Sequence, residues 1–446
     1  MAAWILVSGL DDLFITLVHF TIRRGRFPWP SESDLRRKSE RPIAILVPLW
    51  HEHSVIRQML ARNLAAIRYR NYHVFVGVYP NDRPTVRAVS AEARRHRRVH
   101  IAVGPHDGPT SKGDCLNWTY RYMQEFEARH GMRFRVVMTH DAEDVVHPDS
   151  LRMINWFSRK HGMVQIPVLP LPTPAREWTH GLYCDEFAEY QTKDIPVRQH
   201  LGGFLPANGV GTGFAREALE RLAVARGGPP FDPECLTEDY ETGFEIHAMG
   251  YRQVFVPLQP SSAGAPAPHA ESCATREYFP RRARASIRQR CRWVTGIALQ
   301  GWERHGWNVP WPQVYWFWRD RKGLVGNLLT PLDNLLLLYS VTRYGHLVDI
   351  LPAWFAICCQ VTFFIAVLQT GMRTQSAAGI YGWKFAALAP LRVVWANLVN
   401  CAATVRAIGE YGLARWAGVG VAWKKTEHTY PVNPQWAPQP DPAPHQ

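Results

Sequence analysis

The strongest chemical signal in this sequence is a dense acidic cluster. Asp141, Glu143 and Asp144 fall within four residues, directly after the apolar run 134–139. Carboxylates this close repel one another unless a divalent cation or solvent screens them. The functional interpretation is a bound divalent cation that holds a polyphosphate. The alternative is an acidic turn that starts the next helix, and the cluster alone does not choose between the two.

Two other positions carry residue types that suit catalysis or phosphate binding. Glu238 and Asp239 follow Thr237, and repulsion by Glu238 would make Asp239 the stronger base. The alternative is an ordinary helix start, with Thr237 as the N-cap and acidic residues in the first turn. Lys112 lies in the glycine-flanked loop GPTSKGD, where it either contacts a phosphate or is a solvated loop lysine.

Alternating strands and helices must position these side chains. Apolar, β-branched runs predict strands at 43–49, 73–79, 99–103 and 134–139. The stretches between them predict helices at 54–67, 84–95 and 113–128. This order predicts an α/β domain with a mostly parallel sheet, whose ligands bind beyond the carboxyl ends of the strands. Glu52, Asp82 and Lys112 follow three of these strands. No GxGxxG or GxxxxGK[ST] follows a strand, which excludes a dinucleotide fingerprint and a P-loop.

Composition limits the class of protein. The 446 residues are too many for one ordinary hydrophobic core, and a mean hydropathy of −0.22 with 20% charged residues excludes a many-span transporter. The net charge of +13 suits nucleic acid, anionic lipid or a phosphorylated substrate. The eight cysteines form no CxxC pair, so a zinc module or disulfide framework is not expected, and a reducing, cytoplasmic catalytic part fits best.

Several apolar segments predict membrane attachment. Segment 347–370 is long enough to span a bilayer, and 324–341 spans only if it packs on a neighbour because Asp333 lies in its middle. Together they predict a hairpin with positively charged, cytoplasmic flanks. Segment 2–20 reads as an N-terminal anchor, or as a buried or interfacial helix because of Asp11 and Asp12. Polar residues at helical spacing in 385–408 predict a helix lying in the membrane interface.

Arginines are dense just before the hairpin. Arg281, Arg284, Arg288 and Arg292 recur at steps of three or four, which places them on one face of a predicted basic, interfacial helix. The residues after 431 are proline-rich and are expected to be disordered. The predicted organisation is an anchor at 1–26, a catalytic domain at 41–300, a transmembrane hairpin at 324–370, an interfacial helix with a loop at 385–430 and a tail at 431–446.

Several motifs in order resemble the membrane-bound glycosyltransferases of family 2. They are VPLWHE, YPND, SKGDCLN, HDAED, NGVGTGF, TED and the QxxRW motif that ends at Trp293. TED, followed about 50 residues later by QxxRW and then by apolar segments, is the specific part. SGLDDLF near the N-terminus and WKKTEHTYP near the end resemble a narrower group within the family that is named for bacteriophage adsorption.

The resemblance implies a Rossmann-like GT-A fold and a role for each matching residue. It assigns the nucleotide sugar to Glu52, Asp82, Lys112, Asp141, Gln289 and Arg292. It assigns Mg²⁺ or Mn²⁺ to Asp141, Glu143 and Asp144, with the second DxD position occupied by Glu143. It makes Asp239 the general base beside Glu238, and Trp293 the contact for the acceptor sugar. It places Trp423, Lys425 and Thr426 in a loop over the nucleotide.

The expected protein is an inverting glycosyltransferase of a bacterial inner membrane, multi-pass, with its catalytic domain in the cytoplasm. It would move a hexosyl or N-acetylhexosaminyl group from a nucleotide-diphosphate sugar, with UDP favoured, to a growing glycan or a lipid-linked acceptor. Membrane lipids and an export partner are expected, and nucleic acid is not, because no recognition module is present. The alternative is a non-catalytic membrane receptor or scaffold that retains the fold. The shape of the loop 208–214 would decide the sugar.

Overall fold

The structure is a computed structural model of the chain, and it describes residues 2–22, 27–258, 272–342, 352–420 and 429–431. The chain divides into two compact units, each made of several segments. The helical unit comprises Met1–Arg26, Pro172–Gly203 and Phe279–Ala422. The sheet unit comprises Phe27–Leu171, Phe204–Tyr278 and Trp423–Gln446.

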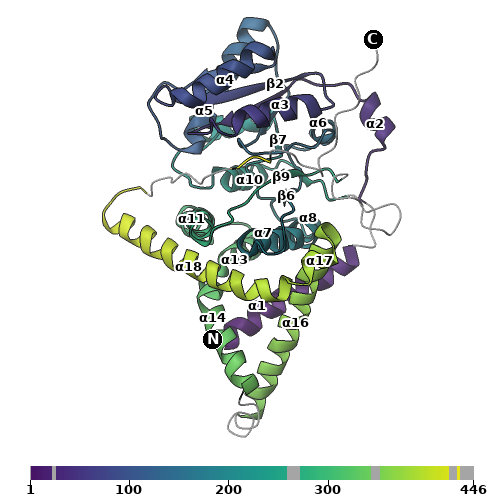
Figure 1. Ribbon diagram of the computed structural model, residues 1–446, viewed down its shortest axis with the longest axis vertical. Helices are drawn as coiled ribbons and strands as arrows, with labels where there is room; N and C mark the ends of the chain where they lie inside the picture. Colours follow the sequence, from purple (N-terminus) through teal and green to yellow (C-terminus); the bar gives the residue numbers. More distant parts are fainter. Residues whose placement is uncertain (1, 23–26, 259–271, 343–351, 421–428, 432–446) are drawn as a thin grey trace. The chain divides into compact units, whose positions relative to one another are not determined.

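A seven-stranded sheet forms the centre of the sheet unit (Figure 1). Its strands, in spatial order, are β3 (Val99–Val103), β2 (Tyr72–Val78), β1 (Ile43–Pro48), β4 (Val136–Thr139), β7 (Thr212–Ala215), β5 (Met163–Gln165) and β8 (Gln253–Phe255). The pairs β3–β2, β2–β1, β1–β4 and β5–β8 are parallel, whereas β7 runs antiparallel to both its neighbours. A second, two-stranded sheet pairs β6 (Val168–Pro170) with β9 (Thr275–Glu277). The predicted mixed α/β fold with a mostly parallel sheet is confirmed, and the four predicted strands are β1 to β4.

Helices cover both faces of this sheet, as the continuous apolar runs of its strands require. They are α2 (Glu32–Arg37), α3 (Ile56–Ala66), α4 (Arg83–Arg95), α5 (Lys112–His130), α6 (Ser150–Phe157), α9 (Arg216–Arg226) and α10 (Glu238–Ala248). The three predicted helices of this region are α3, α4 and α5. Helix α5 approaches β2 so closely that a Cβ on Gly77 would lie 2.3 Å from Thr119 Oγ1.

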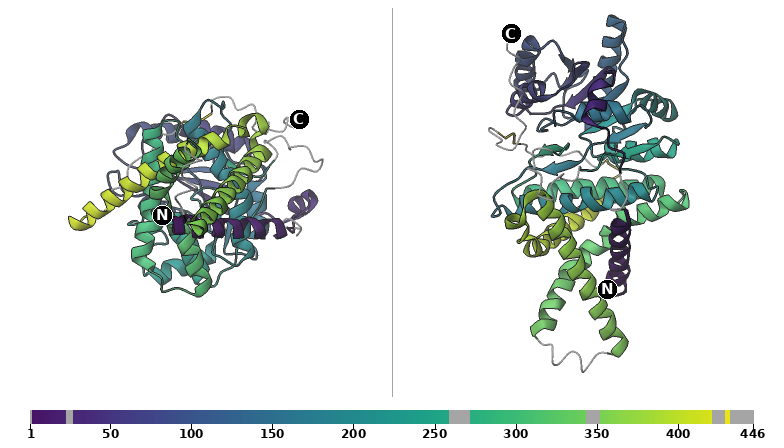
Figure 2. Two further views of the ribbon diagram at one scale, coloured as in Figure 1. Left: turned by 90° about the horizontal axis from the view of Figure 1, so that it is seen from below. Right: turned by 90° about the vertical axis from the view of Figure 1, so that its right-hand side faces the viewer.

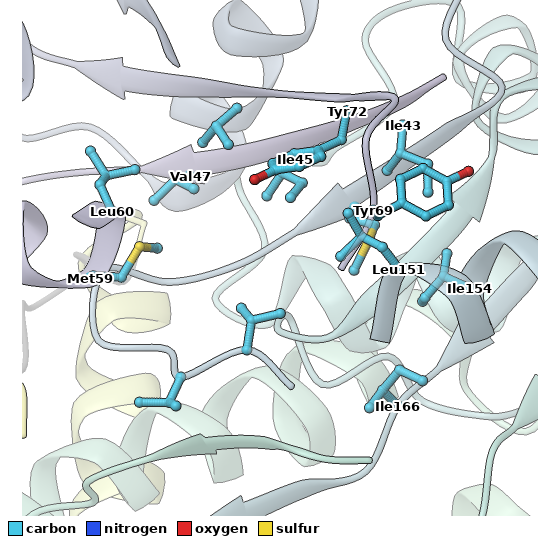
Figure 3. Packing of buried hydrophobic residues seen from close by; sticks show 14 of the residues in the cluster. Ile43, Ile45, Val47, Met59, Leu60, Tyr69, Tyr72, Leu151, Ile154 and Ile166 are labelled. Atoms are coloured by element: carbon cyan, nitrogen blue, oxygen red, sulfur yellow. The ribbon is translucent and has the colours of Figure 1, made fainter. Parts of the chain in front are cut away.

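The main core of the sheet unit lies on one face of β1. Ile43, Ile45 and Val47 alternate along the strand and pack with Met59 and Leu60 of α3 (Figure 3). Each of the five is at most 4% exposed. Leu151 and Ile154 of α6 complete the same cluster. This packing fixes the carboxyl end of β1, where the predicted site begins.

The helical unit contains no strand within the described residues. Its elements are α1 (Ala2–Ile22), α7 (Trp178–Glu189), η1 (Tyr190–Asp194), α8 (Ile195–His200), α11 (Ala283–Trp293), η2 (Val294–Gln300), α12 (Gly301–His305), α13 (Trp311–Arg321), α14 (Gly323–Thr342), α16 (Ala353–Tyr381), α17 (Trp383–Ala386) and α18 (Ala389–Trp416). The elements η1 and η2 are π-helical. Figures 1 and 2 show α14 and α16 leading away from α18, with α1 packed against α16.

Two helices, α1 and α16, are long and apolar enough to cross a membrane, by length and composition. The apolar segment expected at 347–370 begins its helix later, at Ala353, and continues to Tyr381. The turn expected between the hairpin segments lies outside the described residues. Helix α14 contains Pro331 and keeps Asp333 half-buried.

Ion pairs account for the two aspartates that interrupt α1. Asp11 pairs with Arg319 and lies 2.8 Å from Lys322 Nζ, and Asp12 Oδ1 lies 2.7 Å from the same amine. Tyr315 also donates its hydroxyl proton to Asp11 Oδ1 over 2.6 Å. These contacts tie α1 to α13. Arg319 and Lys322 come just before the predicted hairpin, and these ion pairs engage both charges inside the protein.

Two of the polar residues on which the prediction of an interfacial helix rested, Arg392 and Asn400, face the protein. Arg392 is fully buried and forms a bidentate pair with Asp185 of α7, at 2.6 and 2.8 Å. Asn400 accepts a hydrogen bond of 2.7 Å from Arg290. The outward stripe of α18 is apolar and exposed, and it consists of Leu391, Val394, Leu398, Val405, Ile408, Leu413 and Trp416.

Candidate functional site

Three carboxylates surround Lys112 at the carboxyl end of the sheet. Lys112 is the first residue of α5, and its Nζ lies 2.7 Å from Asp141 Oδ1, after β4, and 3.9 Å from Glu238 Oε1. Burial lowers the pKa of Lys112, but the charges of Asp141 and of both acidic residues at the start of α10 more than offset it, so its pKa lies above the ordinary value. The ammonium group therefore stays charged and keeps these carboxylates together.

Gly209 brings Asp239 into the same group. Its φ of +73° is in the left-handed region that glycine adopts without strain. A Cβ at this position would lie 2.7 Å from Asp239 Oδ2 and 3.1 Å from Lys112 Nζ, so the backbone of the 208–214 loop lies directly against both side chains. Asp239 Oδ1 accepts the N–H of Tyr240 at 2.8 Å.

The acidic loop after β4 is held from within by Asp144. This residue is fully buried, and its Oδ2 lies 2.6 Å from His140 Nδ1 and accepts the N–H of Asp141 at 3.0 Å. Burial raises the pKa of Asp144 well above its usual range and lowers the pKa of His140 to about 4. Asn63 of α3 clamps the same loop, because it donates to the Asp144 carbonyl at 2.8 Å and accepts the N–H of Val146 at 3.1 Å.

The donor set fits a cation that also takes phosphate ligands. Within the described residues, no group of three or more His, Cys, Asp and Glu side chains is gathered as a complete protein cage. Mg²⁺ in polyphosphate sites commonly takes only one or two carboxylates, with phosphate oxygens and waters as the other ligands. Asp141, which is partly exposed, and Glu143, which is 3% exposed, meet that requirement. Asp144 already uses its Oδ2 to hold the loop.

Glu52 and Asp82 lie at the carboxyl ends of β1 and β2, as predicted, but both are buried. Asp82 Oδ2 accepts the N–H of His51 at 2.7 Å, and Oδ1 accepts the N–H of Thr85 at the start of α4. His51 has a φ of 55°, which is rare for a residue with a side chain. Asp82 thus stabilises a strained turn next to the site.

Gln289, Arg292 and Trp293 belong to the helical unit, on α11. Gln289 Oε1 and Arg292 Nε are buried and hydrogen-bond to no atom in the described part of the chain. The Trp293 ring packs edge-on to Tyr183, with centroids 6.1 Å apart, and η2 begins at the next residue. π-Helical turns of this kind are frequent at functional sites.

The arginines of α11 divide into two sets. Arg284 and Arg288 are exposed, as expected for a basic face. Arg290 points inward and pairs with Glu186 at 2.6 Å. The loop residues Trp423, Lys425 and Thr426 lie outside the described residues.

Sequence reasoning missed the residues that support the acidic loop. His140 was part of the motif HDAED but received no role, although it contacts Asp144 directly. Asn63 had a usable signal, because it falls on the buried face of α3 with Ile56, Met59 and Leu60. A buried amide at such a position usually has a hydrogen-bonding role.

The family follows from a comparison with known proteins. The model of a family described as "Glycosyltransferase like family 2" matches residues 41–296. The chain belongs to this family. The match includes every predicted site residue except those of the loop at 423–426. Family 2 membership and the sheet order together establish a GT-A fold.

The proteins similar to this family 2 chain include bacteriophage adsorption proteins and a mannosyltransferase. Bacteriophage adsorption protein B of Escherichia coli strain K12 and bacteriophage N4 adsorption protein B of Escherichia coli O157:H7 are each 36% identical to it over 461 residues. The alignments cover 97% of this chain and 61% of each relative, so the chain spans about three fifths of the length of these curated relatives. Among solved structures it is similar to the mannosyltransferase PcManGT from Pyrobaculum calidifontis in complex with GDP-Man and Mn²⁺. That similarity has a TM-score of 0.52 and 18% identity, and covers 89% of this chain and 99% of the other.

Proposed function

We propose that this protein is an inverting glycosyltransferase that moves a hexosyl or N-acetylhexosaminyl group from a nucleotide-diphosphate sugar, with UDP favoured, to a glycan or lipid-linked acceptor. The observation that carries the proposal is the convergence of Lys112, Asp141, Glu238 and Asp239 around the backbone of Gly209. A cation and a set of carboxylates at the carboxyl end of a GT-A sheet suit the departure of a diphosphate and the activation of a hydroxyl group.

The diphosphate side of the reaction falls to Lys112, Asp141 and Glu143. Lys112 donates to phosphate oxygens from the start of α5, where the helix dipole also favours negative charge. Asp141 and Glu143 hold Mg²⁺ or Mn²⁺, which when bound neutralises charge on the leaving diphosphate. Asp144 keeps the loop in place through His140 and the Asp141 N–H. The similar mannosyltransferase structure contains GDP-Man and Mn²⁺, which supports a nucleotide sugar and a divalent ion here.

The acceptor side falls to Asp239. Its Oδ2, which lies against Gly209, takes the proton of the acceptor hydroxyl. The acceptor oxygen forms a bond to the anomeric carbon while the bond from that carbon to the diphosphate oxygen breaks, with inversion. Glu238 strengthens the base by repulsion, and Lys112 limits that repulsion at 3.9 Å.

The remaining site residues complete the proposal. Glu52 and Asp82 shape the nucleoside end. Gln289 and Arg292, whose buried polar atoms have no hydrogen bond within the described residues, contact the diphosphate, and Trp293 stacks on the acceptor sugar.

We also propose that the protein lies in a bacterial inner membrane, with its catalytic domain in the cytoplasm. Helices α1 and α16, which are long and apolar enough, span the bilayer, and α14 forms a further span. The exposed apolar stripe of α18 lies in the interface, since Figure 1 shows this helix crossing the direction of α14 and α16. Trp416 at the end of the stripe is 88% exposed, which suits an interfacial anchor. Lipids, and a partner for export of a polymer, are the expected neighbours.

The experiment that tests the function is incorporation from labelled UDP-, GDP- and CMP-sugars into membranes, with Mg²⁺ or Mn²⁺. We expect one donor to be used by the wild type, and Asp239→Asn to lose transfer while donor binding changes little. Glu143→Gln should instead weaken metal-dependent donor binding, and EDTA should abolish incorporation until Mn²⁺ is restored. Glu217→Gln, on an exposed part of α9, is the matched control. Equal loss of donor binding in both site variants would contradict the assigned roles.

The second candidate is a non-catalytic membrane receptor or scaffold. It is favoured by the names of the curated relatives, which are adsorption proteins. This candidate predicts no incorporation from any donor and unchanged phage adsorption in Asp239→Asn. The loss of incorporation in that variant would exclude it.

A further inference from the structure

A short segment near the C-terminus is built into the core of the sheet unit. Of residues 429–431, Tyr430 and Pro431 are buried. Tyr430 is 8% exposed and belongs to the same hydrophobic cluster as β1 and α3. The chain therefore returns to this unit about 150 residues after its last strand.

Tyr430 shares its hydrophobic cluster with residues of the acidic loop. Ala142, Val145 and Val146, which lie in that loop, are members of the same cluster. The charges of Arg62 and Asp144 both act on the Tyr430 hydroxyl, and burial raises the pKa of this group. Tyr430 therefore lies in the buried core close to the acidic loop.

The loop is held by several contacts of its backbone, among them two hydrogen bonds of 2.8 and 3.0 Å between Val145 and Arg276. Asp144 holds it through the Asp141 N–H, at 3.0 Å, and Asn63 holds its carbonyl and the following N–H. Both contacts involve backbone atoms, and both depend on the loop staying packed against the core. A large buried ring in the same cluster would contribute to that packing, because close-packed interiors transmit the displacement of a side chain.

We propose that Tyr430 is a positioning residue that keeps the acidic loop, residues 140–146, in the conformation needed by Asp141 and Glu143. The role given to those two carboxylates rests on the proposed function, whereas the support of the loop does not. The ring carries the effect, since the buried Tyr430 hydroxyl forms no hydrogen bond within the described residues. Tyr430→Phe should therefore behave like the wild type, and Tyr430→Ala should not.

The first test is hydrogen–deuterium exchange of the full-length protein in detergent, without any substrate. Tyr430→Ala should speed exchange of the peptide that covers 140–146 about tenfold, because the Asp141 N–H loses its protected position. Tyr72→Ala is the matched control: Tyr72 is fully buried in the same cluster but at the amino end of β2. It should not selectively affect that peptide. Unchanged loop exchange in Tyr430→Ala would overturn the proposal, whether or not any donor sugar is ever found.

The second test separates positioning from simple stability. In the incorporation assay, Tyr430→Ala should raise the Mn²⁺ concentration for half-maximal rate and the KM for the donor at least fivefold, with a smaller change in kcat. Tyr430→Leu, which keeps apolar volume, covers the case in which the alanine variant does not fold. Equal kcat losses in the Tyr430 and Tyr72 variants, with KM unchanged, would show a purely structural role and refute the proposal.

Discussion

The ion pair between Lys112 and Asp141 allows a sharp test of the site. In one interpretation Lys112 only neutralises the carboxylates beside it, and in the other it also contacts the departing diphosphate. The variants Lys112→Met, Asp141→Asn and the combination of both separate them. If neutralisation is the whole role, removing the charge of Asp141 should compensate for the loss of Lys112.

The structure sets the expected magnitudes. At 2.7 Å, the Coulomb energy of the pair is about 6 kcal/mol for an effective dielectric constant of 20, before desolvation is subtracted. The net contribution of a hydrogen bond to a charged group is about 1.5–3 kcal/mol. We therefore expect a coupling free energy of that size between Lys112 and Asp141 in the unfolding of the substrate-free protein. Loss of a donor to the transition state should lower kcat/KM by about 10²- to 10³-fold in Lys112→Met.

The assay is incorporation from the donor that the wild type uses, with thermal midpoints of the same detergent-solubilised variants. We expect Lys112→Met/Asp141→Asn to recover stability relative to Lys112→Met and to remain inactive, because both the phosphate contact and a metal ligand are lost. Recovery of kcat/KM to within about tenfold of the wild type, a difference of about 1.4 kcal/mol, would refute the catalytic role of Lys112.

Two further predictions concern stability. Arg392→Met leaves Asp185 buried without its partner and should lower the free energy of unfolding by about 3–5 kcal/mol, and adding Asp185→Leu should restore most of it; a thermal midpoint unchanged by Arg392→Met would contradict this. Burial lowers the pKa of His147 from 6.5 to about 4, and its Nδ1 accepts the N–H of Asp149 at 3.2 Å. The contribution of neutral His147 to the free energy of unfolding is therefore complete above pH 6.5 and is lost as the pH falls toward 4. At pH 5 the loss is about 2 kcal/mol, and His147→Asn, which keeps an acceptor but does not titrate, should lose less stability than the wild type between pH 7 and 5.

The parallel part of the fold was predictable because its two signals, apolar strand runs and the helical stretches between them, are local in the sequence. β1 to β4 are apolar runs flanked by helical stretches, and the first three strand–helix repeats put Asp82 and Lys112 at the carboxyl edge of the sheet. The antiparallel strand β7 was not predicted, because two of its four residues, Gly213 and Ala215, are small and do not favour a strand. Its place between β4 and β5 depends on long-range pairing that no local pattern encodes.

The site was predictable in its members but not in its contacts. The sequence grouped Asp141, Glu143 and Asp144 as equals, and only burial distinguishes them: Asp144 faces His140 inside the unit, whereas Asp141 reaches Lys112. The contacts of the polar residues of α18 were also not predictable. A pattern of arginine and asparagine among apolar residues gives a two-sided helix but not the side that meets the protein, and Arg392 finds a buried partner about 200 residues away.

The long sequence separation between α1 and its partners has a consequence for synthesis of the protein. Asp11 and Arg319 are 308 residues apart. At about 5–20 residues per second, the arginine emerges roughly 15–60 s after the aspartate. During that interval the two carboxylates of this apolar helix lack their counter-charges. Helix α1 can therefore reach its final packing only after α13 has been made, so the first helix of the chain is completed by a segment made much later.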